Sequence, residues 1–221
     1  MVQVLRKGRE YSREKYSREC KGLTGIIHTF TKKKMPVHSY FVLLAFTLLG
    51  IMLILQVAGL KRDGLKFMGT PSIDKYYFYS GKVALFTSWA LFIIKAIIPK
   101  LGYINLPVHV SWIATGLLWA GACIVAFALA GLGRSLKMGL PEMETTLQTK
   151  GIYRFSRNPL YAGIYMISIA SCLYFPDLIS ASFVLYGIFI HHRIIREEEI
   201  FLAQRFGMEW VNYSAKVGRY L

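Results

Sequence analysis

A polar passage in the second half of the chain, residues 145–161, is rich in groups that bind small charged molecules. Tyr153, Phe155 and Tyr161 offer aromatic faces that can hold a cation or stack on an aromatic base. Pro159 suits the first turn of a following helix, whose free backbone N–H groups favour an anionic group such as a carboxylate. The passage therefore predicts a binding site for a small charged ligand, although a membrane-surface loop with aromatic and basic residues would have a similar composition.

A run of three glutamates, Glu197 to Glu199, follows an apolar stretch later in the chain. On a helix, Glu198 lies one turn from Ile194 and from Leu202, so its carboxylate should face neighbouring helices rather than water. A carboxylate in such a place requires a positive partner. The candidates are Arg157, Arg154 and the ammonium group of a ligand. The alternative is a solvated helix with ion pairs on its surface, which suits Glu197 or Glu199 better than all three glutamates together.

The elements that must position these groups are apolar helices. Hydrophobic residues make up 54% of the 221 residues and charged residues only 18%, against about 25% charged in a typical soluble domain. Residues 39–60, 76–98 and 111–133 are each long enough for a bilayer crossing of about 20 residues. A further apolar stretch, 158–190, is broken at 175–177 into the two short arms of a helical hairpin. These patterns predict an all-α, polytopic membrane protein with about five transmembrane helices, and exclude soluble globular, disulfide-rich secreted and disordered chains.

Charged and small residues within the predicted spans have separate expected roles. Lys82, near the start of 76–98, and Lys95, near its end, are expected to extend toward the lipid headgroups. The span 111–133 carries a stripe of small residues that predicts close contact with another helix. These residues are Gly116, Gly121, Ala122 and Ala126.

Lysine and arginine outnumber aspartate and glutamate by 27 to 12. In a chain with these helices, anionic headgroups and the positive-inside rule explain the excess without nucleic acid as a partner. The connection after 111–133 and the C-terminal segment are both basic, whereas the hairpin tip between them has no lysine or arginine, so both segments are expected to face the cytoplasm. The three cysteines are scattered and form no CxxC pair, so no metal site is predicted.

Two stretches carry a resemblance to a known family. The first is Gly151-Ile-Tyr-Arg-Phe-Ser-Arg-Asn-Pro-Leu-Tyr161; the second, after the hairpin, is Glu198-Glu-Ile-Phe-Leu202 with Phe206-Gly-Met-Glu-Trp-Val-Asn-Tyr213. In order and separation they resemble the isoprenylcysteine carboxyl methyltransferase and phospholipid methyltransferase superfamily. Members carry G-x-Y-R-x-x-R-H-P-x-Y, then E-E-x-x-L and F-G-x-x-Y-x-x-Y. The resemblance covers residues 134–220.

The resemblance implies an integral membrane methyltransferase that uses S-adenosylmethionine and acts on a lipophilic acceptor. The acceptor group would be an isoprenylcysteine-like carboxylate, a lipid amine or a thiol, and the implied partners are membrane lipids and this acceptor, for example a prenylated cysteine. The implied location is the bacterial inner membrane or the endoplasmic reticulum, with the catalytic region toward the cytoplasm. The implied cofactor-binding residues are Thr145, Thr146, Leu147, Gln148, Tyr153, Asn158, Pro159, Leu160, Tyr161 and Glu198.

The pattern of charged and apolar residues, together with the resemblance of the C-terminal part, divides the chain. The expected parts are a basic N-terminal arm (1–38), which would lie partly helical on the membrane surface, transmembrane helices (39–133) and a catalytic region (134–221). The catalytic region would consist of the connecting loop, the helical hairpin and C-terminal interfacial helices. Methyl transfer from a sulfonium is a displacement on an activated donor, so positioning and exclusion of water are required and a covalent nucleophile is not.

Two positions depart from the family pattern. Asn158 replaces the usual histidine and cannot change its charge near neutral pH, which argues against an obligatory histidine acid or base there. Ile194 stands where the family has a substrate-contacting arginine, which leaves Arg193 and Arg196, on the adjacent face, as candidate substrate-binding residues. His192, beside His191, is a candidate for proton removal.

Two other functions share parts of this pattern. Membrane reductases of the sterol or steroid type, which use NADPH, carry a similar R-x-x-R-H-x-N-Y segment and a C-terminal Y-G-x-x-W-x-x-Y. A non-enzymatic scaffold that retains the fold is the other alternative. The E-E-x-x-L ending and Pro159 favour the methyltransferase.

Overall fold

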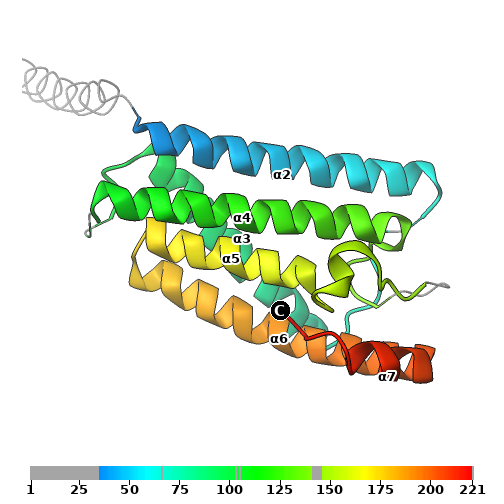
Figure 1. Ribbon diagram of the computed structural model, residues 1–221. Coiled ribbons are helices and arrows are strands. Elements are labelled where there is room, and N and C mark those ends of the chain that lie inside the picture. The colour runs from blue at the N-terminus through cyan, green and yellow to red at the C-terminus, as the bar shows by residue number, and fades with distance from the viewer. Residues whose placement is uncertain (1–34, 66, 103, 105, 141–145, 221) are drawn as a thin grey trace, which may run out of the picture. The chain divides into compact units, whose positions relative to one another are not determined.

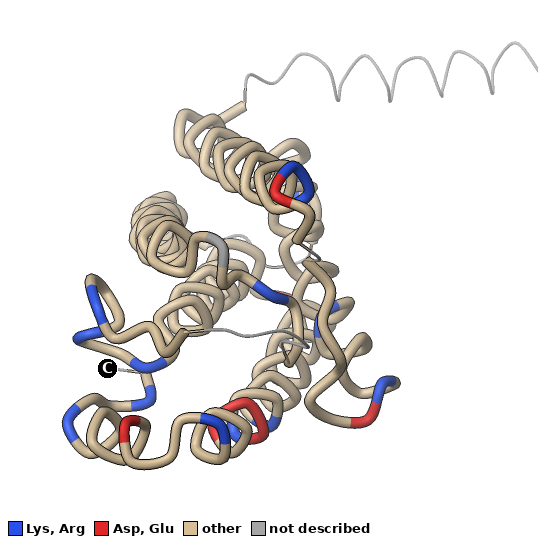
Figure 2. The backbone as a smooth tube through the Cα atoms, turned by 90° about the vertical axis from the view of Figure 1, so that its right-hand side faces the viewer, with Lys and Arg blue, Asp and Glu red and all other residues tan. Residues whose placement is uncertain are grey.

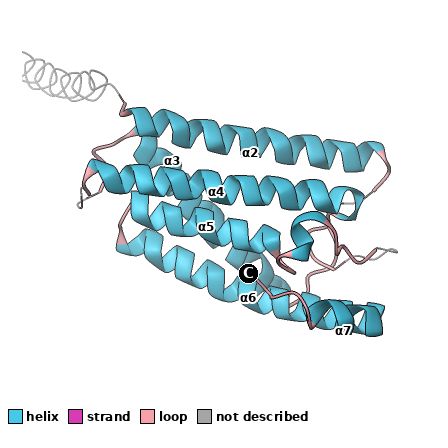
Figure 3. Ribbon diagram, in the orientation of Figure 1, coloured by secondary structure: helices cyan, strands magenta, loops and turns pink. Residues whose placement is uncertain are grey.

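The computed structural model of the chain describes residues 35–65, 67–102, 104, 106–140 and 146–220. Most of the predicted N-terminal arm and the predicted cofactor residue Thr145 lie outside these residues. Within them the secondary structure is helical, and the only β pairing is two isolated bridges (Figure 1, Figure 3). The α-helices are α2 (Val37–Arg62), α3 (Lys75–Ile97), α4 (Val108–Leu132), α5 (Pro159–Tyr174), α6 (Leu178–Phe206) and α7 (Met208–Ser214). The 3₁₀ helices in the connection between α4 and α5 are η1 (Gly133–Ser135) and η2 (Gly151–Arg154).

The four helices α2, α3, α4 and α6 are long and apolar enough to cross a membrane. The fifth apolar helix, α5, is shorter, with 16 residues, or about 24 Å at a rise of about 1.5 Å per residue. Pro159 occupies its first turn and Pro176 follows its end, so prolines bound it on both sides. The polytopic helical membrane protein expected from the sequence is confirmed, with four long spans and the shorter α5.

Helix α6 differs from its prediction. The sequence suggested a membrane helix that ends near Ile190 and a separate interfacial helix after it. Instead, α6 continues for 29 residues from Leu178 to Phe206. No proline interrupts it, and it ends where Gly207 takes a positive φ of 51°. The three glutamates are therefore on the same continuous helix as the apolar residues that pack within the bundle.

Glycines allow two pairs of helices to approach closely. In α4 and α5, a side-chain carbon on Gly121 would lie 2.8 Å from the carbonyl oxygen of Gly163, and one on Gly163 would lie 2.8 Å from that of Gly121. A side-chain carbon on Gly81 of α3 would clash with the Ile190 side chain of α6, and one on Gly187 of α6 would clash with the Leu85 side chain of α3. Gly121 thus makes the close contact expected of the small-residue stripe, whereas Gly116 faces open space. Figure 1 shows α4 beside α5, with α3 behind the row of helices.

The loops at one end of the bundle are tied to each other. The α2–α3 loop pairs with the segment after η1 through the bridges Met68–Met138 and Thr70–Leu140. The N–H of Leu140 donates to the carbonyl of Thr70 at 2.7 Å. Gly139 has a φ of 99°, which favours glycine at this position. Figure 2 looks along the helices onto this end, where charged residues lie in the loops and at the helix ends.

Candidate active site

Both polar passages predicted from the sequence border one cleft at this end of the bundle. The cleft has about 930 Å³ of empty space, including its mouth. The predicted residues that line it are Thr146, Leu147, Gln148, Tyr153, Asn158, Leu160, Tyr161 and Glu198. Pro159 is instead buried in the first turn of α5, where its ring begins the helix and so sets the direction of its two neighbours. The structure thus brings together segments that are about 40 residues apart in the chain.

Glu198 faces the interior, as its helical position predicted. The hydroxyl of Tyr161 donates to the carboxylate and lies 3.2 Å from each of its oxygens. The second neighbour is Lys82 of α3, whose positive charge attracts the carboxylate. The arginines suggested as partners are placed differently, because Arg154 is exposed and Arg157 contacts Glu199 instead.

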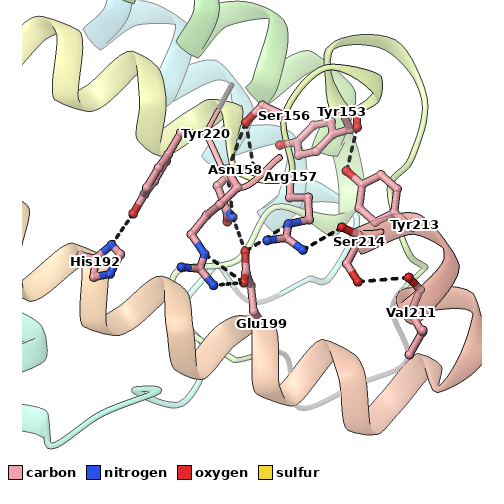
Figure 4. A network of polar contacts seen from close by, with 11 residues as sticks. Tyr153, Ser156, Arg157, Asn158, His192, Glu199, Val211, Tyr213, Ser214 and Tyr220 are labelled. Carbon is pink, nitrogen blue, oxygen red and sulfur yellow. Dashed lines mark hydrogen bonds and ion pairs between the residues drawn. The ribbon is translucent and has the colours of Figure 1, made fainter. Parts of the chain in front are cut away.

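Glu199 is the buried member of the acidic run, with 8% of its surface exposed. The guanidinium of Arg219 donates to its Oε2 through Nε at 3.0 Å and Nη2 at 2.8 Å. Asn158 Nδ2 donates to its Oε1 at 2.9 Å, and Arg157 Nε lies 3.4 Å from the same oxygen (Figure 4). The interpretation of Glu199 as a solvated surface residue is therefore wrong, because the end of the chain folds back over this side of α6.

The segment that folds back is residues 216–220, which we term the C-terminal strap. The backbone N–H groups of Arg157 and Asn158 donate to the carbonyls of Gly218 and Arg219, at 2.9 Å and 3.1 Å. The side-chain amide of Asn158 also donates to the Arg219 carbonyl at 3.3 Å. Asn158 therefore borders the cleft while its amide holds the strap. This contact explains how an asparagine can serve structurally where the family usually has histidine.

Aromatic side chains form one wall of the cleft. Trp210 and Tyr213 of α7 line it together with Tyr153 of η2. The Tyr213 hydroxyl donates to the Tyr153 carbonyl at 2.7 Å, and the Arg157 guanidinium lies 5.7 Å from the centroid of the Trp210 ring. Burial raises the pKa of Tyr213 to about 12 and also raises that of Tyr153. Both hydroxyls consequently stay protonated and can donate hydrogen bonds at physiological pH.

A second cavity adjoins the cleft within the bundle. It has about 1010 Å³ of empty space and a mostly apolar lining from α2, α3, α4, α5 and α6. The residues that line both spaces are Lys137, Gly139, Leu160 and Tyr161. Lys82 and His191 also line the second cavity. Lys82 thus lies against the interior, and the expectation that it extends to the headgroups is wrong, because its face of α3 packs toward α6.

The comparisons with known proteins agree with this arrangement. Residues 110–209 match the family model described as phospholipid methyltransferase. The match covers 100 of the 221 residues. The family lies in the membrane methyltransferase superfamily that the two motifs resemble, so that resemblance is confirmed. No curated protein matches the chain. The matched region begins in α4 and ends in α7, so it contains both polar passages.

Other predicted residues line neither the cleft nor the apolar cavity. His192 Nδ1 is 2.7 Å from the Tyr220 hydroxyl in the C-terminal strap. His191, one position earlier, faces the apolar cavity instead. Arg193 and Arg196 are exposed on the outer side of α6 and line neither cavity. Their predicted role in substrate binding, and that of His192 in proton removal, gain no support from this placement.

The position of the family's substrate-contacting arginine is also filled differently. Ile194 has 0% of its surface exposed and packs against Phe78 of α3 and Ile190. An arginine would not fit this apolar contact without displacing α3. Phe78 in turn carries the ammonium of Lys82 over its ring, with Nζ 4.1 Å from the centroid. The positive charge in this part of the protein therefore comes from α3 rather than from α6.

Sequence reasoning missed several residues of the site. Trp210 and Tyr213 belong to the second motif, which could have indicated them. Glu199 is also in the second motif, but its buried position was not predicted. Lys82 and Arg219 carry no such signal, because their partners come from segments that only the tertiary structure brings together.

Proposed function

We propose that the chain is an integral membrane methyltransferase that uses S-adenosylmethionine to methylate a lipophilic acceptor. One observation carries the proposal: Tyr161 borders both a polar cleft at the end of the bundle and an apolar cavity between the helices. A reaction between a water-soluble donor and a lipophilic acceptor requires such a meeting point. The match of residues 110–209 to the phospholipid methyltransferase family supports the same class of reaction.

The residues of the cleft fit the proposed cofactor. Glu198 offers a carboxylate to a cation, and Gln148 and Thr146, which hydrogen-bond to each other at 3.0 Å, offer polar groups. The aromatic faces available for a sulfonium or an adenine are those of Tyr153, Tyr161, Trp210 and Tyr213. When bound, S-adenosylmethionine supplies a methyl group on a positively charged sulfur.

The chain's own groups then act by positioning. The Tyr161 hydroxyl holds the Glu198 carboxylate through both oxygens, which fixes the negative charge next to the cleft. The apolar cavity would take the hydrocarbon part of the acceptor and exclude water from the reacting groups. Correct placement of two reactants can lower a barrier by about 7–11 kcal/mol. Placement of the donor and the acceptor can therefore account for catalysis without a covalent nucleophile on the protein.

His191 is the better placed of the two histidines for proton removal. Its Nδ1 lies 2.7 Å from the carbonyl oxygen of Gly187. Because a carbonyl only accepts hydrogen bonds, Nδ1 carries the proton, and in the neutral ring Nε2 keeps a free lone pair. An amine or thiol acceptor must lose a proton, and His191 could take it, whereas a carboxylate acceptor has no proton to lose.

We also propose that the cleft faces the cytoplasm. The connections and helix ends around it carry lysines and arginines, which the positive-inside rule places on the cytoplasmic side. These residues include Lys137, Lys150, Arg154, Arg205 and Lys216. A cysteine introduced at exposed Lys150, in a background without the native cysteines, tests this orientation. In intact cells it should resist a membrane-impermeant maleimide, and labelling from outside would contradict the proposed orientation.

The proposed reaction is tested by cofactor titration of the purified full-length chain in a neutral detergent. We expect saturable binding of labelled S-adenosylmethionine, displaced by S-adenosylhomocysteine, and no binding of NADPH. Transfer of the labelled methyl group is then measured with a panel of prenylated cysteines, lipid amines and lipophilic thiols. Binding of NADPH alone would indicate the reductase, and binding of neither cofactor would indicate a scaffold.

A further inference from the structure

Lys82 occupies a distinct place in the apolar cavity. It lies on α3 seven positions before Trp89, which lines the same cavity, so the two residues are separated by about 10 Å along the helix axis. Lys137 and Tyr161, which border the cleft as well, lie at the Lys82 end. The cavity therefore has a polar end next to the cleft and an apolar part farther along the helices.

Lys82 brings a positive charge to the polar end of the cavity, and no carboxylate is among the described residues that line it. The Lys82 ammonium is held over the Phe78 ring at 4.1 Å, a contact that fixes its position without neutralising its charge. An apolar pocket with lysine at one end is complementary to a molecule with a hydrocarbon chain and an anionic headgroup.

The carboxylate that interacts electrostatically with Lys82 lines the cleft. Glu198 attracts Lys82, but in the proposed function the same carboxylate also holds a cationic cofactor. Two positive groups would then share one negative charge, which leaves a partly buried lysine short of a counter-charge. An anionic group in the apolar cavity would restore the balance.

We propose that Lys82 binds an anionic headgroup, a carboxylate or a phosphate, on the lipophilic acceptor and thereby determines which acceptors are used. This inference rests on the proposed function, because only that function makes the bound molecule the methyl acceptor. It assigns the recognition of the headgroup to α3 rather than to the exposed arginines of α6. The hydrocarbon chain lies along Trp89 and Ile167, and the headgroup lies beside Tyr161.

The test uses ligands that share one hydrocarbon chain and differ in headgroup charge. Binding of hexadecanoate, hexadecyl phosphate and hexadecanol to the full-length protein is measured in neutral detergent, without cofactor, by displacement of a fluorescent lipophilic probe. The variants are Lys82→Met, Lys82→Gln and Lys82→Arg, with Lys75→Met as the matched control, since Lys75 is exposed on the same helix. The partition of each ligand into the micelles is measured without protein and is the same for every variant, so the corrected ratio of anion to alcohol affinity reports the protein.

The wild type should prefer at least one anion over hexadecanol by about tenfold, the value of one charge-assisted hydrogen bond. Lys82→Met and Lys82→Gln should lose this preference, whereas Lys82→Arg and Lys75→Met should keep it. The anion that shows the preference identifies the headgroup as carboxylate or phosphate. Equal affinity for anions and alcohol in the wild type, or a preference that survives Lys82→Met and Lys82→Gln, would overturn the inference.

The binding measurement is made without the cofactor and does not depend on methyl transfer. If S-adenosylmethionine does not bind in its own titration, the proposed function is wrong. The preference of Lys82 for anions is still tested independently by the ligand displacement. If the cofactor binds and the headgroup preference is absent, only the role of Lys82 is lost.

Discussion

The two sides of α6 around Glu198 and Glu199 differ in how completely their charges are compensated. Glu199 receives two bonds from Arg219, one from Asn158 and the nearby charge of Arg157. Glu198 receives a shared bond from Tyr161 and the attraction of Lys82. The carboxylate of Glu199 thus has its hydrogen-bonding capacity largely used by the protein, whereas that of the adjacent Glu198 does not.

This difference separates structure from function. A carboxylate whose oxygens are fully used by the protein holds segments together, and a ligand could bind it only by breaking those bonds. A carboxylate beside a cleft, with oxygens that share one donor, can still accept a cation. We therefore assign the Glu199 side to stability and the Glu198 side to binding, and substitutions on both sides and on the outer face of the helix test this assignment.

The largest effect is expected for Glu198→Ala. The substitution removes the carboxylate and leaves the positive charge of Lys82 uncompensated beside the cleft, so the affinity for S-adenosylmethionine should fall by about a hundredfold or more. Equilibrium binding of the labelled cofactor measures the change. Unchanged affinity would remove Glu198 from the cofactor site.

Glu199→Gln should instead lower the free energy of unfolding by about 2–3 kcal/mol. This is less than the roughly 3–5 kcal/mol expected when one partner of a fully buried ion pair is removed, because the Arg219 side chain is 35% exposed. Denaturant unfolding in detergent gives the free energy, and limited proteolysis reports release of the C-terminal strap. Arg219→Ala should act in the same direction, and the double variant should cost less than the sum. Additive effects would show that the two residues act independently.

Tyr161→Phe sharpens the comparison, because it keeps the aromatic ring and removes only the hydroxyl that holds Glu198. The loss of one neutral-donor hydrogen bond predicts about three- to tenfold weaker cofactor binding. The free energy of unfolding should change less than in Glu199→Gln. A hundredfold loss would mean that the hydroxyl contacts the cofactor directly.

The smallest effects are expected on the outer side of the same helix. Glu197 and Arg193 are exposed and line neither cavity. Glu197→Gln and Arg193→Met should change cofactor affinity by less than about twofold and stability by less than about 0.5 kcal/mol. A large loss of methyl transfer in Arg193→Met, with binding of the cofactor intact, would restore the predicted substrate role of this arginine.

Local patterns in the sequence predicted much of the fold. The spans expected at 76–98 and 111–133 correspond to α3 and α4 within a few residues. The hairpin break at 175–177 was predictable because Pro176 cannot continue a helix. The inward direction of Glu198 followed from helical periodicity.

Contacts between distant segments could not be predicted in the same way. The partner of Glu199 is 20 residues later, in an irregular segment with no periodicity. The direction of Lys82 depends on which face of α3 packs against α6, and glycines that permit that packing look like any other small residues in a membrane helix. In both cases the deciding information is the tertiary contact itself.

The short length of α5 has a consequence for the surrounding lipid. Its 16 residues cover about 24 Å, several ångströms less than a typical hydrocarbon core of about 30 Å. Ile169 and Leu173 expose part of their surface, so lipid chains beside them meet a hydrophobic mismatch that is relieved by local compression of the leaflet. Turnover should therefore depend on acyl-chain length and be faster in short-chain than in long-chain phosphatidylcholine.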